Sequence, residues 1–194
     1  PRAVKASDTA CCIYTSGTLG HPKGVLLSHG NIVSDVTASL SRFPISEQDR
    51  TLAFLPWAHA FGQIADLHVM VRVGCQVAIN GEVSTLLTNL ALVKPTLLVA
   101  VPRVFCRIYE VVRKQIAHRS QPIQWLFHRG VAAATQRANG QALSWADRLC
   151  LSIADRLVFR RIRRYFGGSL RLVISGSAAL SQDVAEFVNA IGID

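Results

Sequence analysis

Apolar and polar positions alternate along the chain with two different periods. Short apolar runs bounded by polar, Gly or Pro residues predict strands at 11–14, 25–27, 51–55, 76–79, 96–101 and 170–174. Between these runs, apolar residues recur at helical spacing over 32–40, 64–73, 83–93, 102–116, 121–165 and 183–190. This order predicts an α/β fold with a mostly parallel sheet covered by helices.

Cap and turn residues indicate where the helices begin and end. Asn31 or Ser34 is expected to cap the first helix, and Ser181 the last one. Pro102 can open the helix after the fifth strand, because proline is tolerated in a first helical turn. The long helical stretch is expected to break near Asn139.

Composition limits the class of protein. With 194 residues, 50% of them hydrophobic, the chain can bury a substantial core and is not a disordered segment. The formal net charge of +9 suits a polyanionic ligand such as ATP or CoA, an anionic membrane or a nucleic acid. Charge alone does not choose among these partners.

An arginine-rich run near the end of the chain concentrates the positive charge, and apolar residues accompany it. A solvated helix face is its simplest interpretation, and peripheral contact with an anionic membrane is the alternative. No nucleic-acid partner is expected, because aromatic residues for base stacking are not interleaved with the run. The run contains Arg156, Arg160, Arg161, Arg163 and Arg164, with Arg156, Arg160 and Arg163 expected to share one face.

Cysteine usage predicts neither a disulfide framework nor a metal site. The five cysteines are an odd number, and no C-x-x-C pair or His/Cys metal spacing occurs among them. Each lies among apolar neighbours, as buried cysteines usually do. We therefore expect a cytoplasmic protein, with peripheral attachment to a membrane as the alternative. No apolar run approaches the roughly 18 residues of a membrane span. The cysteines are Cys11, Cys12, Cys75, Cys106 and Cys150.

The segment with the strongest chemical signal is a loop rich in hydroxyl groups and glycine between the first two strands. It reads Tyr14-Thr15-Ser16-Gly17-Thr18-Leu19-Gly20-His21-Pro22-Lys23-Gly24. Its glycines let backbone N–H groups approach an anion, its hydroxyl groups donate, and Lys23 adds a compact positive charge. A plain turn is the alternative interpretation. A Walker-type loop is not expected, because Pro22 and Gly24 flank the lysine.

This loop resembles the phosphate-binding signature Y-T-S-G-T-T-G-x-P-K-G of the adenylate-forming (acyl-CoA synthetase) superfamily. The departure is Leu19, which stands where the family usually has a second threonine, so one hydroxyl donor is missing. The segment Leu55-Pro56-Trp57-Ala58-His59-Ala60-Phe61 resembles the L-P-x-A-H-x-F motif of the long-chain fatty acid–CoA ligases. Without the resemblance, His59 and Phe61 would be read as packing residues.

Two further segments resemble the same family. Lys94-Pro95-Thr96 with 101–109 resembles the K-P-T…V-P-R-x-x-x-R-I-Y stretch of the long-chain branch, and is expected to be scaffold. Ser175-Gly176-Ser177-Ala178-Ala179-Leu180 resembles the S-G-G-A-P-L loop that lines the adenine pocket. Ser177 and Ala179 replace the family's glycine and proline, so the resemblance does not fix the exact shape of this loop and leaves Gly176 and Ala178 as the implied adenine contacts.

The resemblance implies a role for each motif. Lys23 is the expected catalytic residue and would oppose the charge that develops on the phosphates; no protein ligand to a metal is expected. His59 and Phe61 would border the acyl chain and adenylate. The phosphate-binding residues would be Thr15, Ser16, Gly17, Thr18, Gly20 and Lys23, and the adenine-binding residues Gly176, Ser177, Ala178 and Ala179.

The implied reaction is ATP-dependent activation of a long-chain fatty acid to acyl-adenylate and then to acyl-CoA, with fatty acid, ATP, Mg²⁺ and CoA as substrates and cofactor. Residues 1–194 would be part of the N-terminal domain of a longer ligase, without its C-terminal domain and inactive alone. One alternative is a fatty acyl-AMP ligase that passes the acyl group to a carrier protein. Another is a non-catalytic basic module that binds membranes.

Overall fold

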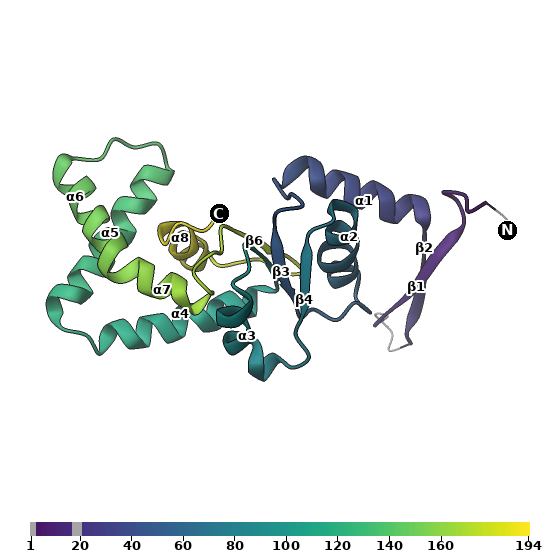
Figure 1. The fold of residues 1–194 in the computed structure, drawn as a ribbon, viewed down its shortest axis with the longest axis horizontal. Coiled ribbons are helices and arrows are strands. Elements are labelled where there is room, and N and C mark those ends of the chain that lie inside the picture. Colours follow the sequence, from purple (N-terminus) through teal and green to yellow (C-terminus); the bar gives the residue numbers. More distant parts are fainter. Residues whose placement is uncertain (1–2, 17–20) are drawn as a thin grey trace. The chain divides into compact units, whose positions relative to one another are not determined.

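The computed structural model describes residues 3–16 and 21–194. These residues form two compact units (Figure 1). The first unit comprises Pro1–Asp49 with Leu55–Val77, and the second comprises Arg50–Phe54 with Ala78–Asp194. The phosphate-loop motif and the His59 segment belong to the first unit, and the small-residue loop at 175–180 belongs to the second.

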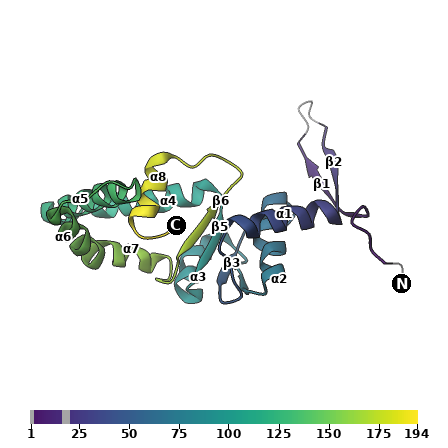
Figure 2. The same ribbon diagram turned by 90° about the horizontal axis from the view of Figure 1, so that it is seen from above.

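An antiparallel hairpin begins the first unit, and Figure 2 shows its two strands side by side. Strands β1 (Thr9–Thr15) and β2 (Lys23–Ser28) pair over their whole length, with Thr15 opposite Lys23. The two predicted strands are therefore confirmed. The unit also contains α1 (His29–Arg42), the π-helical segment η1 (Gly62–His68) and α2 (Val69–Val73).

Helix α1 begins earlier than the sequence pattern indicated, so the prediction of Asn31 or Ser34 as the cap was wrong. The cap is Ser28, whose hydroxyl oxygen accepts a hydrogen bond from the Asn31 N–H at 3.2 Å. The Asn31 side-chain oxygen accepts in turn from the Ser28 N–H at 3.0 Å. This reciprocal capping box satisfies two backbone donors and fixes the start of the helix directly after β2.

A mostly parallel sheet forms the centre of the second unit, as predicted. Its strand order is β4 (Gln76–Ile79), β3 (Arg50–Ala53), β5 (Leu97–Ala100), β6 (Leu172–Ser175). Strand β5 pairs in parallel with both β3 and β6 and is entirely buried. Continuous apolar sequence suits a strand that is covered on both faces.

Helices flank this sheet, while α5 and α6 extend beyond it and α5 packs on α6 and α8 (Figures 1 and 2). Most helices lie where the periodicity placed them. Pro102 is in the first turn of α4, as predicted. Ser181 is the residue before α8, although its side chain makes no capping hydrogen bond. The helical elements are η2 (Val83–Thr85), α3 (Leu86–Val93), α4 (Pro102–Ala117), α5 (Gln121–Ala138), α6 (Trp145–Ala154), the π-helical η3 (Asp155–Phe159), α7 (Arg160–Tyr165) and α8 (Gln182–Ala190).

The core of the second unit is aromatic and aliphatic. Phe105, Phe159 and Phe187 are at most 2% exposed and belong to one buried cluster with residues of the central strand. Helix α5 approaches α6 closely at Gly130, where an added Cβ atom would lie 2.5 Å from the Ala154 Cβ atom. Glycine at this position therefore permits the two helices to pack.

Candidate active site

The hairpin register brings the two ends of the phosphate-loop motif together. Thr15 lies directly opposite Lys23, so both side chains lie on the same face of the hairpin at the mouth of the loop. Thr15, Ser16 and Lys23 are all exposed, so their hydroxyl and ammonium groups are accessible to a ligand. The motif residues Gly17, Thr18, Leu19 and Gly20 lie outside the described residues.

Close packing explains the glycine that follows the lysine. A Cβ atom at Gly24 would lie 3.0 Å from the Cys12 sulfur and 3.6 Å from a ring carbon of Tyr14. Tyr14 is also the register partner of Gly24. A larger residue at position 24 would therefore disturb the strand pair one residue away from Lys23.

The His59 segment forms a tight turn that leads into the π-helical segment η1. The His59 N–H donates to the Pro56 carbonyl oxygen at 3.1 Å, and the His59 carbonyl oxygen accepts from the Gln63 N–H at 2.9 Å. Gly62 is required in this turn, because an added Cβ atom would lie 2.7 Å from the Pro56 oxygen. His59 is exposed and Phe61 is half-buried, so the histidine is available to a ligand.

A side-chain contact links the hairpin to this segment inside the first unit. The Cys11 thiol on β1 donates to the Gln63 side-chain oxygen at 3.6 Å. Gln63 lies four residues after His59, so the strand that leads into the phosphate loop is tied to the helix that follows the histidine. Within the described part of the chain, no hydrogen bond or ion pair joins Lys23 to His59.

The predicted adenine loop follows β6 at the carboxyl end of the parallel strands, where open α/β sheets bind ligands. The Gly176 N–H donates to the Ala100 carbonyl oxygen at 3.4 Å and continues the pairing of β5 with β6. Ala178 and Ala179 are exposed. Ser177 has a φ of +69°, the left-handed conformation that favours glycine. The serine therefore adopts a backbone conformation in which glycine would be less strained.

Two buried donors beside these motifs were not identified from the sequence. The Trp57 indole N–H and the Ser175 hydroxyl are buried and have no hydrogen-bond partner within residues 3–16 and 21–194. Buried donors usually have partners, so an unpaired one next to a motif is a ligand candidate. Both lie inside the quoted motifs, Trp57 two residues before His59 and Ser175 immediately before Gly176.

Metal-binding residues do not gather anywhere in the described part of the chain. Residues 3–16 and 21–194 contain no group of three or more His, Cys, Asp or Glu side chains that could hold a metal ion. In the same residues, no helix is long and apolar enough to cross a membrane.

The first unit carries a lysine-bearing hairpin loop, and the second unit carries a parallel sheet with a small-residue loop after β6. Motifs of these two kinds are typical of nucleotide-binding α/β proteins. The chain belongs to the family of AMP-binding enzymes, which matches it over residues 1–194.

Curated relatives match almost the whole chain. It is 32% identical over 207 residues to the long-chain-fatty-acid–CoA ligase FadD15 of Mycobacterium tuberculosis, covering 98% of this chain and 32% of the relative. It is 35% identical over 188 residues to the peroxisomal long chain acyl-CoA synthetase 6 of Arabidopsis thaliana, covering 95% of this chain and 25% of the relative. The chain thus spans about a quarter to a third of the length of these relatives.

Solved structures support the fold. The adenylation domain of a carboxylate reductase from Mycobacterium chelonae has a TM-score of 0.69 at 22% identity, covering 96% of this chain and 25% of that chain. The O-succinylbenzoate coenzyme A synthetase of Bacillus subtilis, solved in complex with AMP, has a TM-score of 0.58 at 21% identity, covering 98% of this chain and 36% of that chain. The predicted α/β fold is therefore confirmed as that of the N-terminal domain of adenylate-forming enzymes.

Proposed function

We propose that the full-length protein is a long-chain fatty acid–CoA ligase. A fatty carboxylate attacks the α-phosphate of ATP, and the bond to pyrophosphate breaks to leave acyl-adenylate. The thiol of CoA then attacks the acyl carbon, AMP departs, and acyl-CoA forms. The observation that carries this proposal is the identity of 32–35% with enzymes of these names over at least 95% of the chain.

The phosphate loop contributes electrostatic stabilisation in this scheme. The strand pair holds the Lys23 backbone opposite Thr15, so the lysine side chain starts from a fixed place at the mouth of the loop. A preorganised positive charge is most effective where negative charge develops, here on the departing pyrophosphate. A general base is not required, because a fatty carboxylate is ionised at neutral pH.

The other two motifs bind the organic parts of the substrates. His59 and Phe61 border the acyl chain and the adenylate, and Gly176 to Ala179 border the adenine. The exposed small residues after β6 support the second role, because small side chains let a flat ring approach the backbone. The Ser175 hydroxyl is buried and has no hydrogen-bond partner among the described residues, so a nucleotide would reach it only if the adjacent loop shifts.

Mg²⁺ accompanies ATP in the proposed reaction, and its positive charge would offset charge on the phosphates. The side chains of residues 3–16 and 21–194 do not fit a metal site, because no cluster of candidate ligands occurs among them. We therefore derive no catalytic step through the metal.

ATP–pyrophosphate exchange with fatty acids tests the adenylation step in the full-length protein. Lys23→Ala is expected to lower the exchange rate by roughly 10²- to 10³-fold, the usual effect of removing one preorganised donor. Lys5→Ala is the matched control, since Lys5 is an exposed lysine of the same unit that lies outside the loop. Unchanged exchange in Lys23→Ala would reject the phosphate role.

The acceptor separates this proposal from the alternative enzyme. A ligase transfers the acyl group from the adenylate to CoA, whereas a fatty acyl-AMP ligase transfers it to a carrier protein. Supplying each acceptor to the full-length enzyme with labelled fatty acid shows which thioester forms. We expect acyl-CoA, and we expect the isolated 194-residue chain to form none.

A second candidate function, peripheral membrane contact, is favoured by an exposed apolar stripe on α6 and η3. Every fourth residue of this stretch is a large apolar side chain in contact with solvent. Such contiguous exposure usually marks an interaction surface, and tryptophan is typical of the membrane interface. The stripe consists of Trp145 (79% exposed), Leu149 (54%), Ile153 (41%) and Leu157 (46%).

The arginines beside this stripe supply charge for anionic lipids. Arg156, Arg160 and Arg164 are exposed, whereas Arg163 turns inward and bonds to Asp155. The expectation that Arg163 shares the basic face was therefore wrong. Sedimentation with anionic vesicles tests the contact: Trp145→Ser with Leu149→Ser is expected to release the full-length protein. Unchanged binding of this double variant would reject the surface.

A further inference from the structure

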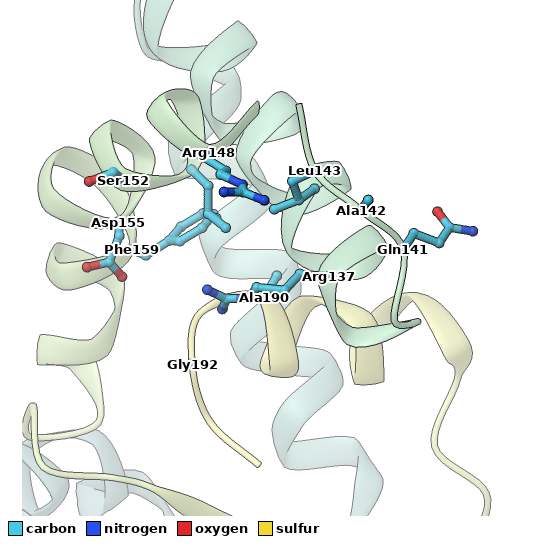
Figure 3. A pocket seen from close by; sticks show the side chains of 11 residues that line it. Arg137, Gln141, Ala142, Leu143, Arg148, Ser152, Asp155, Phe159, Ala190 and Gly192 are labelled. Carbon is cyan, nitrogen blue, oxygen red and sulfur yellow. The ribbon is translucent and has the colours of Figure 1, made fainter. Parts of the chain in front are cut away.

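A hollow of about 610 Å³ lies in the second unit between α5, α6, η3 and the end of α8 (Figure 3). Its volume falls in the usual range for small-molecule sites, about 300–1,000 Å³. It is lined by Arg137, Gln141, Ala142, Leu143, Arg148, Leu151, Ser152, Asp155, Phe159, Ala190 and Gly192. We call it the arginine pocket. None of these residues belongs to the motifs assigned above.

The pocket has an apolar floor. Phe159 is fully buried, and Leu151 and Ala190 are at most 8% exposed. Figure 3 shows the Phe159 ring on the side formed by η3, with the side chain of Leu143 across the hollow. Leu143 is only half-buried, so an apolar group of a ligand could cover its exposed part, at roughly 25 cal/mol for each Å² removed from water.

Two exposed arginines line the hollow, and Figure 3 shows their side chains. Arg137 comes from the last turn of α5, and Arg148 comes from α6. Neither side chain forms an ion pair or a hydrogen bond with any residue of the described part of the chain. Arginine is well suited to carboxylate and phosphate groups, because its planar donors bind two oxygens at once.

The acidic residue that lines the pocket does not neutralise these arginines. Asp155 accepts two hydrogen bonds from Arg163, at 2.6 and 3.2 Å. Arg163 also donates to the Ile191 carbonyl oxygen at 2.7 Å, which ties η3 to the segment after α8. The pocket therefore carries two uncompensated positive charges, and a bound anion would reduce the repulsion between them.

Close packing holds the walls in place. Gly130 allows α5 to contact α6 at Ala154, so the helices that carry the two arginines are fixed against each other. Gly192 has a φ of +80° and turns the chain at the end of α8, opposite this contact. A site on rigid elements loses less conformational entropy on binding than a site on mobile loops.

We propose that the arginine pocket binds an anionic amphiphile. Its phosphate or carboxylate group is held between Arg137 and Arg148, and its apolar part lies against the half-buried Leu143. This site is separate from the proposed adenylation site and does not depend on it. The ligand chemistry could come from a free amphiphile in solution or from the head group and upper chain of an anionic lipid.

Titration calorimetry of the full-length protein with octyl phosphate below its micelle concentration tests the proposal. Wild type is expected to bind octyl phosphate, and Arg137→Gln with Arg148→Gln to lower the affinity at least about tenfold. The matched control is Arg42→Gln with Arg119→Gln, two exposed arginines outside the pocket whose replacement changes the net charge equally. The control is expected to bind like wild type. Absent binding by wild type, or an equal loss in both double variants, would overturn the proposal.

Further ligands show whether the pocket requires both the anionic and the apolar part of octyl phosphate, and vesicles show the source of the ligand. Inorganic phosphate and octyl maltoside, each carrying half of the ligand chemistry, are expected to bind at least about tenfold more weakly than octyl phosphate; equal binding of either would refute the amphiphile. Phosphatidylcholine vesicles, prepared with and without phosphatidic acid, are then added to compete with octyl phosphate. Displacement only by the vesicles that contain phosphatidic acid would indicate an anionic lipid as the source of the ligand, whereas no displacement would indicate a free amphiphile. Lys23→Ala is expected to leave octyl phosphate binding unchanged, whereas the pocket variants are expected to leave ATP–pyrophosphate exchange unchanged. The two proposals can therefore fail separately.

Discussion

Replacing Gly130 with alanine tests how closely α5 and α6 pack. The new Cβ atom would lie 2.5 Å from the Ala154 Cβ atom and 3.0 Å from the Phe159 ring. Carbon atoms normally approach to about 3.5–4.0 Å, so the helices must separate by roughly 1 Å. Overpacking of this kind costs about 1–3 kcal/mol. The Ala154 methyl group has no alternative rotamer, so we expect a value in the upper half of that range.

Helix propensity acts in the opposite direction. Alanine is favoured over glycine inside a helix by roughly 1 kcal/mol. The net effect expected for Gly130→Ala is therefore a loss of roughly 1–2 kcal/mol in the free energy of unfolding. Urea denaturation gives this value, and hydrogen exchange of the α5 and α6 amides shows whether the loss lies in these helices.

A double variant isolates the steric contact. Gly130→Ala with Ala154→Gly moves the methyl group from one helix to the other, so the pair should be more stable than the sum of the single variants by about 1 kcal/mol or more. Ala132→Gly, at an exposed position of α5, reports helix propensity alone. If Gly130→Ala stabilises the protein and the double variant shows no coupling, the close helix contact is refuted.

Three further predictions concern backbone strain, pH and thiol reactivity. Ser177→Gly should raise the free energy of unfolding by up to about 1 kcal/mol, because the left-handed φ disfavours serine. Ser169→Gly is the control at a position without positive φ, and it should lower the free energy of unfolding. A lower free energy of unfolding in both variants would contradict the strain at Ser177. The Ser144 hydroxyl, and to a smaller extent Arg129, lower the pKa of Asp147 in the folded protein below its ordinary value of 3.8. The charged Asp147 therefore stabilises the folded state fully above pH 3.8. This stabilisation is lost as the pH falls through the lower pKa of the folded state. Asp147→Asn should therefore weaken the α5–α6 contact at neutral pH and have less effect near pH 3, as measured by hydrogen exchange; an equal effect at both values would contradict the linkage. Burial raises the pKa of the Cys150 thiol, so iodoacetamide should modify exposed Cys12 well before Cys150. Peptide mass spectrometry measures both rates of modification, and equal rates would contradict this order.

The sequence predicted the fold well because the longer helices show an apolar face and the short strands stand out as apolar runs between polar, Gly or Pro residues. The buried strand β5 reads as a continuous apolar run, and Pro102 fits only the first turn of the helix after it. The cap of α1 was misplaced because Ser28 and Asn31 are both good capping residues. Only the reciprocal hydrogen bonds in the structure show that Ser28 is the cap and that Asn31 supports it.

The inward turn of Arg163 could not be read from α-helical spacing. Residues eight positions apart differ by about 80° around a regular α-helix, so Asp155 and Arg163 would not share a face. The π-helical segment η3 lies between them and adds about one residue to a turn. The two side chains therefore align and form their ion pair, and the arginine pocket keeps its charge. Sequence periodicity carried no signal for this change of phase.

The site motifs were found from residue types in order, but their spatial relations were not. The pairing of Thr15 with Lys23, the Cys11 contact with Gln63 and the left-handed Ser177 depend on strand register and backbone geometry. The exposed stripe beginning at Trp145 depends on which faces of α6 are buried, and that is decided by contacts distant in sequence.

The position of the irregularity in the hairpin determines which changes in length the loop can tolerate. The register of β1 with β2 shifts between Thr9 and Cys11, at the end far from the loop, and is regular from Cys11 to Thr15. One residue inserted into the regular part would turn Thr15 away from Lys23, because neighbouring strand residues point to opposite faces. One residue inserted at the bulge would leave this pair in place. Length variation is therefore expected at the start of β1, while the spacing from Cys11 to Thr15 stays constant.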